Sequence, residues 1–329
     1  MTEQKFRWGI LGPGRIAEQF AEDIGVVSNA ELYAVASSSA DRAKNFARRY
    51  NAPKTYSAYI DLVTDPEVDA VYIATSHRFH FENAVLCLEA GKPTLCEKPL
   101  TVNAKEAQQL IELSQSTQVF LMEALWSLYL PVFTQVREWI DSGKIGDITL
   151  LTSTFGFRSE GSKDDRWLNP ELAGGALLDL GVYNVAISQW VMQKNPEHFS
   201  AHAHLGEPGV DELTAATLVY DKGVISQFTC NLISRTANDM FIYGTKGYIQ
   251  LHAGFWCAEK ATLFVDGKEE TVNMPFRSQG FEYEIEEAQR CIQAGLLESP
   301  GMPQADSLAN MELMDAIRAE IGLKYPFED

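Results

Sequence analysis

Gly12-Pro13-Gly14-Arg15-Ile16-Ala17 is the stretch that decides the fold prediction for this chain. It follows a short apolar run at residues 8–11 and opens a predicted helix. In this G-x-G-x-x-A spacing the first glycine permits a tight turn, the second lets backbone approach a pyrophosphate, and the small third residue lets helix and strand pack closely. The N–H groups at a helix start bind anions. We therefore expect a dinucleotide to bind here, with contacts from Gly12, Gly14, Arg15 and Ile16.

Strand and helix patterns alternate around this fingerprint. Near-continuous apolar strands separated by helices are typical of a parallel sheet that is covered on both faces. Asn103, with Glu106 three residues later, is a candidate helix cap. We predict that residues 1–123 form a dinucleotide-binding domain. The predicted strands are 8–11, 32–37, 70–75, 94–97 and 119–122, and the predicted helices are 16–24, 40–50, 79–90 and 104–114.

The pattern changes after residue 125. Successive strand-like runs are separated there by short turn signals such as Asp266-Gly267, which predicts an antiparallel or mixed sheet. Residues 124–329 are therefore predicted to form an α+β domain, with the active site at the junction of the two domains and the C-terminal helix a candidate to pack back on the first. The predicted strands are 148–157, 199–205, 213–220, 224–232, 240–243, 248–252 and 261–265, and the predicted helices are 131–142, 175–192, 281–294 and 307–323.

Composition excludes several classes of partner. The chain has 329 residues with 27 Lys and Arg against 45 Asp and Glu, a net charge of −18. Nucleic acid and anionic membrane surfaces need basic residues, so neither is an expected partner. No apolar run approaches the roughly 20 residues of a membrane span.

The cysteines point to a reducing compartment. There are five, an odd number, with no paired spacing, so we expect neither a disulfide framework nor a metal site. Cys87 and Cys96 are predicted to be buried small hydrophobes. The first seven residues contain no apolar signal core. We expect a cytoplasmic protein without a metal.

The end of the second predicted strand bears on the choice of cofactor. In NAD-binding sheets an acidic residue usually stands there and holds the ribose 2′-hydroxyl. Here the chain reads Ala36-Ser37-Ser38-Ser39, followed by Arg42. Hydroxyls and an arginine suit a 2′-phosphate, so Ser37, Ser38 and Arg42 favour NADP(H) over NAD(H). The alternative is that the serines form a turn and Arg42 is solvated.

Polar residues also follow the third and fourth predicted strands. Ala74 and Thr75 end the third predicted strand, His77 and His80 follow it, and Lys98 comes directly after the fourth, where ligands bind in such sheets. A lysine there can bind a substrate hydroxyl or act as an acid or base. Taken alone, a loop histidine is more often a cap or solvated, and a lysine before proline is more often part of a surface loop.

A second candidate group lies in the later half of the chain. Gly174-Gly175 opens an apolar helical run in which Asp179 and Tyr183 are four residues apart and share one face. An acid and a phenol are unusual on such a helix. Either they satisfy each other structurally, or they line a site as substrate ligand and proton carrier. The pattern alone leaves both interpretations open.

These elements, in this order, resemble the glucose–fructose oxidoreductase / inositol dehydrogenase (GFO/IDH/MocA) family. The matching stretches are 12–17, 74–80, 97–99, 122–124 and 174–183. Within the family the chain is most similar to the branch of dimeric dihydrodiol dehydrogenases and NADP-dependent D-xylose dehydrogenases. That narrower resemblance depends on residues 122–126, 170–179, 298–300 and 314–318.

The resemblance implies a Rossmann domain followed by a domain with a large, open, mostly antiparallel sheet, through whose open face a homodimer forms. It implies hydride transfer between NADP, or alternatively NAD, and a carbinol carbon of a sugar, polyol or cyclic diol. Lys98 matches the catalytic lysine, Asp179 the carboxylate and Tyr183 a position where many relatives carry histidine. Ser38 and Leu128 stand where arginine is expected in this branch. The resemblance also places Glu97, Lys98, Glu123 and Trp126 with the cofactor.

The sequence leaves alternatives for the identity of the substrate and for the class of reaction. Specificity is expected in the loop at residues 158–169, where Arg166 and Trp167, with Phe157 beside them, either face a ligand or lie on the surface. Tyr183 or Lys98 takes the proton of the substrate hydroxyl. Two rival functions share the same motifs: a glycosidase that uses NAD transiently, and a redox-inert sensor that binds NADP.

Overall fold

The computed structural model describes residues 5–161 and 165–328, which form two compact units. Unit 1 comprises Met1–Trp126 and Arg277–Leu308, and unit 2 comprises Ser127–Phe276 and Ala309–Asp329. The segment 277–308 thus belongs to unit 1, whereas the sequence division places it in the second domain. Buried Asp23 explains this membership, because its carboxylate accepts hydrogen bonds from the N–H groups of Phe281 at 2.7 Å and Gln279 at 3.0 Å.

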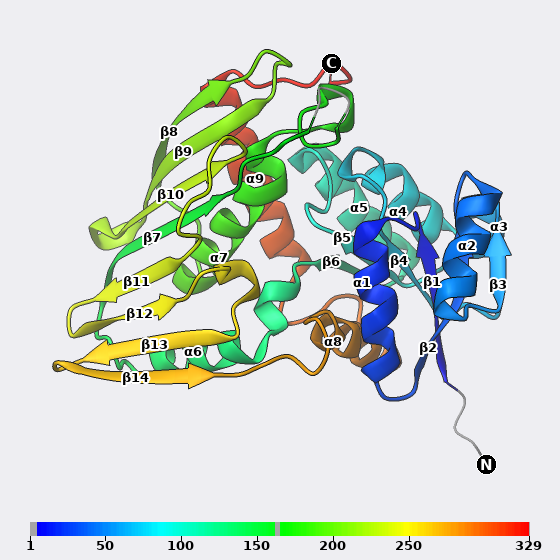
Figure 1. The fold of residues 1–329 in the computed structure, drawn as a ribbon, viewed down its shortest axis with the longest axis horizontal. Helices are drawn as coiled ribbons and strands as arrows, with labels where there is room; N and C mark the ends of the chain where they lie inside the picture. Colours follow the sequence, from blue (N-terminus) through cyan, green and yellow to red (C-terminus); the bar gives the residue numbers. More distant parts are fainter. Residues whose placement is uncertain (1–4, 162–164, 329) are drawn as a thin grey trace. The chain divides into compact units, whose positions relative to one another are not determined.

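The sheet of unit 1 is six-stranded and parallel throughout, in the order β3-β2-β1-β4-β5-β6 (Figure 1). All four residues of β4, β5 and β6 are buried, as expected of strands covered on both faces. The predicted parallel sheet is confirmed. Its strands are β1 (Phe6–Leu11), β2 (Ala30–Ala36), β3 (Lys54–Tyr56), β4 (Ala70–Ile73), β5 (Thr94–Glu97) and β6 (Leu121–Ala124).

Helices connect these strands in the positions that the periodicity predicts. The side chain of Asn103 accepts a hydrogen bond from the N–H of Glu106 at 2.9 Å, so the predicted cap is confirmed. A short strand and helix, β3 and α3, were not predicted, because three and five residues are too few to establish a period. The helices are α1 (Arg15–Asp23), α2 (Ala40–Tyr50), α3 (Tyr59–Val63), α4 (His80–Glu89), α5 (Ala104–Thr117) and α8 (Glu282–Gln293).

The sheet of unit 2 has eight strands in the order β14-β13-β12-β11-β7-β10-β9-β8. Every neighbouring pair is antiparallel except β7 with β10, which confirms a mostly antiparallel sheet. The sequence did not predict β14, because it is polar and largely exposed and so lacks an apolar alternation. The strands are β7 (Ile148–Gly156), β8 (His198–Leu205), β9 (Asp211–Val219), β10 (Ile225–Asn231), β11 (Met240–Gly244), β12 (Gly247–Leu251), β13 (Lys260–Val265) and β14 (Lys268–Asn273).

One face of this sheet carries helices. Asn184 donates to the Ser153 hydroxyl at 2.8 Å, and the Ser188 and Ser226 hydroxyls lie 2.9 Å apart, so α7 is tied to β7 and β10. The predicted single helix over 175–192 is wrong in its first part: residues Leu177–Gly181 form a π-helical turn, and Gly175 has a φ of +128°. The helices are α6 (Pro131–Asp141), α7 (Val182–Met192) and the part of α9 (Gln304–Ile321) beyond residue 308.

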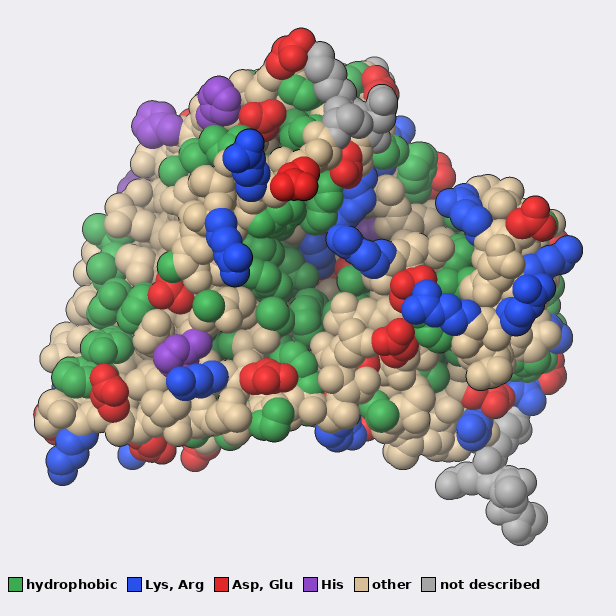
Figure 2. Space-filling view, in the orientation of Figure 1, with side chains coloured by type: hydrophobic (Ala, Val, Ile, Leu, Met, Phe, Trp, Pro, Cys, Tyr) green, Lys and Arg blue, Asp and Glu red, His purple; other side chains and the backbone are tan. Residues whose placement is uncertain are grey.

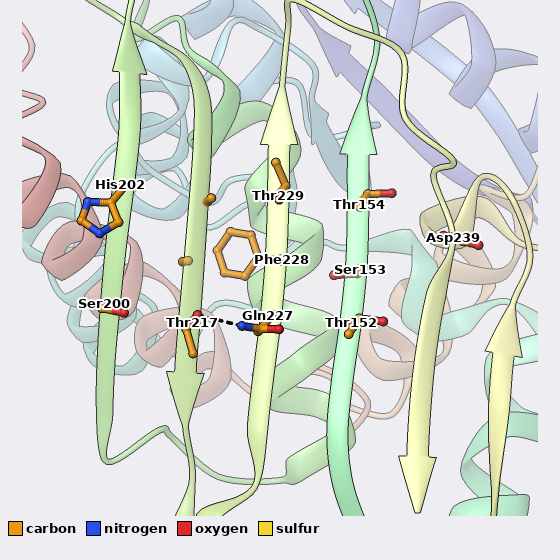
Figure 3. Close-up of a pocket in the computed structure, with 12 residues that line it drawn as sticks. Thr152, Ser153, Thr154, Ser200, His202, Thr217, Gln227, Phe228, Thr229 and Asp239 are labelled. Atoms are coloured by element: carbon orange, nitrogen blue, oxygen red, sulfur yellow. Dashed lines mark hydrogen bonds between the residues drawn. The ribbon is translucent and has the colours of Figure 1, made fainter.

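The opposite face of the sheet is open and polar. Figure 3 shows Ser200 and His202 from β8, Thr217 from β9 and Gln227 from β10 on this face, with Gln227 donating to Thr217 at 3.4 Å. They line a shallow concavity of about 410 Å³. Histidines gather over the β8 edge in Figure 2, in agreement with the exposure of all three histidines of that strand. Polar, exposed side chains on an edge strand discourage uncontrolled strand pairing.

Candidate active site

The two fingerprint glycines have different reasons to be glycine. Gly12 has a φ of +84°, and a Cβ there would lie 2.8 Å from Cγ2 of Thr75, so the fold itself demands glycine. Gly14, the residue before α1, has a φ of −108°, and a Cβ there would meet no described atom within 4 Å. Because no described residue excludes a side chain at Gly14, the described fold does not itself require glycine there, and contact of this backbone with a pyrophosphate stays a prediction. Arg15 and Ile16 follow as exposed residues.

The carboxyl ends of β1 and β4 meet beside this turn. The strand order reverses between these two strands, which is where dinucleotides bind in doubly wound sheets. Thr75, just after β4, packs against Gly12, and Ala74 before it is buried and donates its N–H to Leu11 at 2.9 Å. The fingerprint and the Ala74–Thr75 loop, predicted separately, are therefore brought together.

The end of β2 places a hydroxyl and a guanidinium side by side. Arg42 is exposed and donates to the Ser38 hydroxyl at 3.3 Å, while the Ser39 hydroxyl caps α2. Ser37 is buried, and its hydroxyl accepts the N–H of Ser39 at 3.2 Å. Ser38 and Arg42 are available to a 2′-phosphate, whereas Ser37 shapes the turn below them.

His80 is buried rather than solvated. Its Nδ1 lies 2.8 Å from the carbonyl oxygen of Pro99, and its Nε2 lies 3.0 Å from that of Thr75. Burial lowers its pKa to about 4, and the nearby His77 and Lys98 act in the same direction. The two backbone contacts oppose this shift, because both partners are carbonyl acceptors and a neutral imidazole has only one N–H to donate. The buried ring of His80 therefore lies between the loops after β4 and β5. His77, also buried, lies beside it with the ring centroids 6.4 Å apart.

The Lys98 loop is held by buried carboxyl groups on both sides. Tyr72 of β4 donates its hydroxyl hydrogen to Glu97, whose other oxygen accepts the N–H of Lys98 at 3.2 Å. Glu123 of β6 accepts the N–H of Leu100 at 2.9 Å. Lys98 itself is half-buried at the end of β5. Sequence reasoning missed Tyr72, because it looks like any other residue of an apolar strand.

Glu123 is fully buried in a setting that favours its neutral form. Burial raises its pKa to about 7, although the Ser307 hydroxyl and the Leu100 N–H partly offset that effect. Trp126, nearby in the chain, packs edge-on against Phe281 with centroids 4.8 Å apart. Glu97, Glu123 and His80 surround the Lys98 loop, so each can act by positioning Lys98; their contact with the cofactor stays a prediction.

In unit 2 the predicted substrate residues form one cluster with Asp179. The Arg166 guanidinium lies 3.4 Å from the Asp179 carboxylate and 3.9 Å from the centre of the Trp167 ring. Trp167 meets Phe157 edge-on at 5.0 Å. The Asp179 side chain is 5% exposed and that of Arg166 43% exposed, so the cluster joins a buried acid to an accessible cation.

Tyr183 lies at the start of α7 among aromatic rings. Its ring centroid is 5.9 Å from that of Phe155 and 6.5 Å from that of Trp256, and Phe155 and Trp256 stack at 3.4 Å. Sequence reasoning missed Phe155 and Trp256. Phe155 falls inside a predicted strand, but Trp256 stands in a short 3₁₀ helix 73 residues after Tyr183, and no local pattern links Trp256 to Tyr183.

The described part of the chain offers neither a metal site nor a membrane-spanning helix. Within residues 5–161 and 165–328, no group of three His, Cys, Asp or Glu side chains is arranged to hold a metal ion. In the same residues, no helix has the length and apolar character needed to cross a membrane.

The class of protein follows from the fold together with family models. Residues 6–125 match the model of an oxidoreductase family with an NAD-binding Rossmann fold, and residues 133–250 match the GFO/IDH/MocA C-terminal domain. Trans-1,2-dihydrobenzene-1,2-diol dehydrogenase of Mus musculus is 36% identical over 331 residues, covering 97% of this chain and 98% of that protein. Its Xenopus tropicalis counterpart is 35% identical, with 97% and 99% coverage. The chain belongs to the GFO/IDH/MocA family of oxidoreductases, which confirms the resemblance.

Solved structures agree with this assignment. A 3-ketoreductase from Actinomadura kijaniata, in complex with NADP and TDP-benzene, superposes with a TM-score of 0.87 at 27% identity, covering 96% of this chain and 98% of that one. A levoglucosan dehydrogenase in complex with NADH and levoglucosan has a TM-score of 0.88 at 18% identity and 97% coverage of each chain, and supports the fold alone. The predicted class of enzyme and of cofactor is thus confirmed.

Proposed function

We propose that this protein is an NADP-dependent dehydrogenase acting on a CH–OH group of a sugar, polyol or cyclic diol. The observation that carries the proposal is that Lys98 lies half-buried just after β5, in a loop whose backbone at residues 98–100 is held by Glu97, His80 and Glu123. A lysine that the fold holds this closely, in a sheet built to bind a dinucleotide, is suited to a reacting hydroxyl. The full-length diol dehydrogenase relatives support the substrate class.

The residues of unit 1 fit NADP. Gly14 leaves its backbone open to a pyrophosphate at the start of α1, and Ser38 with Arg42 offers a hydroxyl and a positive charge where an acidic residue would repel a 2′-phosphate. When bound, the nicotinamide ring accepts the hydride in alcohol oxidation. The reaction converts the alcohol and NADP⁺ to a carbonyl compound, NADPH and one proton.

The chain's own residues then bind the substrate and take that proton. Lys98 and Tyr183 are the candidate groups, one accepting the hydroxyl proton and the other donating a hydrogen bond that stabilises the developing alkoxide. Asp179 orients a substrate hydroxyl. Its pairing with Arg166 at 3.4 Å supports this role, because the ion pair holds the carboxylate in one orientation.

Substrate choice is proposed to lie in the cluster of Phe157, Arg166 and Trp167. The two rings form an apolar surface against which the C–H face of a cyclic compound can pack, and Arg166 adds donors beside it. This combination suits a neutral ring that carries hydroxyl groups.

A substrate panel tests the proposed function. Aldoses, inositols and cyclic trans-diols are each mixed with NADP⁺ or NAD⁺, and the absorbance of the reduced nicotinamide is followed. We expect turnover with at least one class, faster with NADP⁺, and a KM for NADP⁺ that rises about tenfold in Arg42→Ala while that for NAD⁺ does not change. Equal efficiency with both cofactors would refute the NADP preference. Binding of NADP without any net reduction would favour a sensor or a transient redox role.

The open face of the unit 2 sheet is proposed to join two copies of the chain. Its concavity of about 410 Å³ lies over β7, β8, β9 and β10, and Ile225 on that face is 37% exposed. Gln227→Arg introduces two charges into a symmetric interface and should yield monomers by light scattering. Gln115→Arg, at an exposed position of α5, is the matched control and should remain dimeric. A monomeric wild-type protein would contradict this part.

A cytoplasmic location completes the proposal. The five cysteines are all unpaired, and four of them are buried, as in proteins of reducing compartments. Cell fractionation tests it.

A further inference from the structure

The Gly174–Gly175 turn connects the two candidate segments of unit 2. The N–H of Gly174 donates to the carbonyl oxygen of Asn169, and that of Gly175 donates to the carbonyl oxygen of Trp167, both at 2.9 Å. A Cβ at Gly174 would lie within 2.9 Å of the carbonyl oxygens of Arg166 and Trp167. The turn therefore fixes the backbone of Arg166 and Trp167 and leads directly into the π-helical turn that carries Asp179.

Asp211 anchors the far end of this turn. One of its carboxylate oxygens accepts the N–H of Leu177 at 2.8 Å and the Thr214 hydroxyl at 2.7 Å. Its other oxygen would stand 2.2 Å from a Cβ at Gly175, so glycine is obligatory there. Asp211 is fully buried at the start of β9. It caps the helical segment from outside that segment, which a local helix signal cannot reveal.

Tyr325 anchors the same turn from the end of the chain. Its hydroxyl donates to the carbonyl oxygen of Gly174 at 2.9 Å, and its side chain is 1% exposed. The Arg318 guanidinium lies 4.6 Å from the centre of its ring, and Arg318 also pairs with Glu328. Glu328 in turn accepts the N–H of Tyr325 at 3.0 Å. The tail after α9 is thus a closed, hydrogen-bonded structure that presents one hydroxyl to Gly174.

We propose that Tyr325 and Asp211 are positioning residues that hold the Gly174–Gly175 turn and thereby set Asp179 and Arg166 for the substrate. The proposal rests on the proposed dehydrogenase function. Each residue acts through a backbone group: Tyr325 through the carbonyl oxygen of Gly174 and Asp211 through the N–H of Leu177. Loss of the Tyr325 hydroxyl leaves a buried carbonyl without its donor, and the turn can relax by moving Arg166 and Asp179 together. Misplacement of a substrate-orienting acid lowers the rate more than it lowers binding of the cofactor.

Two buried tyrosines allow a matched test. Tyr325→Phe removes one hydroxyl and keeps the ring. Tyr220→Phe is the control, because Tyr220 is also 1% exposed but its hydroxyl has no hydrogen-bond partner among the described residues. We expect kcat to fall about tenfold in Tyr325→Phe, with the KM for NADP⁺ and the Kd for NADPH unchanged, and Tyr220→Phe to behave as wild type.

Hydrogen exchange provides a readout that does not depend on turnover. Amides of residues 174–178 should exchange faster in Tyr325→Phe than in Tyr220→Phe, because Leu177 and Gly175 donate within the anchored turn. Asp211→Asn keeps one acceptor oxygen and should give a smaller rise in the exchange rate of the same peptide. This variant replaces Tyr325→Phe in the test if Tyr325→Phe does not fold. Wild-type kcat and unchanged exchange in Tyr325→Phe would overturn the proposal. An inactive wild-type enzyme would overturn the proposed function instead, while exchange still decides the positioning role.

Discussion

The Lys98 loop of unit 1 and the Asp179 turn of unit 2 are built in different ways. The partners that hold the Lys98 loop lie 19 to 25 residues from it in the chain, on the adjacent strands β4 and β6 or at the start of α4. The Asp179 turn, residues 174–181, is held by two distant residues. Asp211 bonds to Leu177, 34 residues away, and Tyr325 bonds to Gly174, 151 residues away. In a parallel sheet the loops that follow neighbouring strands lie at one edge, so residues close in sequence can hold one another. In unit 2 the residues that hold the Asp179 turn come from segments far apart in the sequence.

The two regions also differ in their electrostatics. The Lys98 loop is supported by buried acids, of which Glu123 has a pKa raised to about 7 by its burial. The Asp179 turn instead carries an ion pair whose cation is 43% exposed. The Lys98 loop is therefore supported by a carboxyl group whose charge depends on pH, whereas the Asp179 turn carries an ion pair with an accessible cation.

The largest expected effect comes from Lys98→Met. Removal of the ammonium group should lower kcat by about a thousandfold, because acid–base and electrostatic help at the hydroxyl is lost. The Kd for NADPH, measured by fluorescence titration, should stay within about twofold. Lys105→Met, at an exposed position of α5, is the control. Near-normal turnover of Lys98→Met would show that Lys98 is not the catalytic residue and that the supports around its loop serve folding alone.

The next effect concerns Glu123 and stability. Its folded pKa of about 7 lies above that of an unfolded glutamate, so between these values only the folded state holds the proton. The contribution of Glu123 to stability is therefore full below the unfolded pKa and is lost as the pH rises toward about 7. Glu123→Gln removes this dependence.

Urea unfolding at about pH 5 and about pH 8 measures how the free energy of unfolding depends on Glu123. Relative to Glu123→Gln, the wild type should lose on the order of 2 kcal/mol between the two conditions. Glu89→Gln, at an exposed carboxyl of α4, should keep the wild-type dependence. A wild type and a Glu123→Gln variant with the same dependence would mean that Glu123 is already ionised in the folded protein.

The fingerprint glycines should separate folding from binding. Gly12→Ala places a side chain at a φ of +84° and 2.8 Å from Thr75, so the melting temperature should fall. Gly14→Ala should melt as wild type but bind NADPH about tenfold more weakly, because only the ligand approaches that position. If Gly14→Ala binds normally, the pyrophosphate does not contact this turn.

The smallest effect is expected in unit 2. Arg166→Lys keeps the charge beside Asp179 but loses the planar group that lies 3.9 Å from the Trp167 ring centre. The KM for the substrate should rise about fivefold with little change in kcat. Arg235→Lys, at an exposed position of the same unit, is the control. An unchanged KM would place Arg166 outside the substrate site and weaken the contrast between the two regions.

Particular elements show how far sequence reasoning reaches. β5 and α2 have the predicted bounds, because their ends are marked by turn residues or a cap. β14 was missed because it has no apolar alternation, and the helix predicted over 175–192 includes a π-helical turn that a period of 3.6 residues does not describe. His80 was left between cap, solvated residue and ligand, and the structure places it as a buried bridge.

The sequence alone determined the family and the two kinds of sheet, and it predicts Lys98, Asp179 and Tyr183 as site residues, because each stands in a motif of short range. Only the tertiary structure decided what supports them. Trp256 beside Tyr183, Tyr72 on Glu97, and Asp211 and Tyr325 on the Gly174–Gly175 turn are contacts between segments that the chain brings together on folding. The spacing of the G-x-G-x-x-A stretch predicts a bound dinucleotide, but only the tertiary structure shows that Thr75 packs against Gly12, which makes glycine necessary there, and that no described atom lies near a side chain at Gly14.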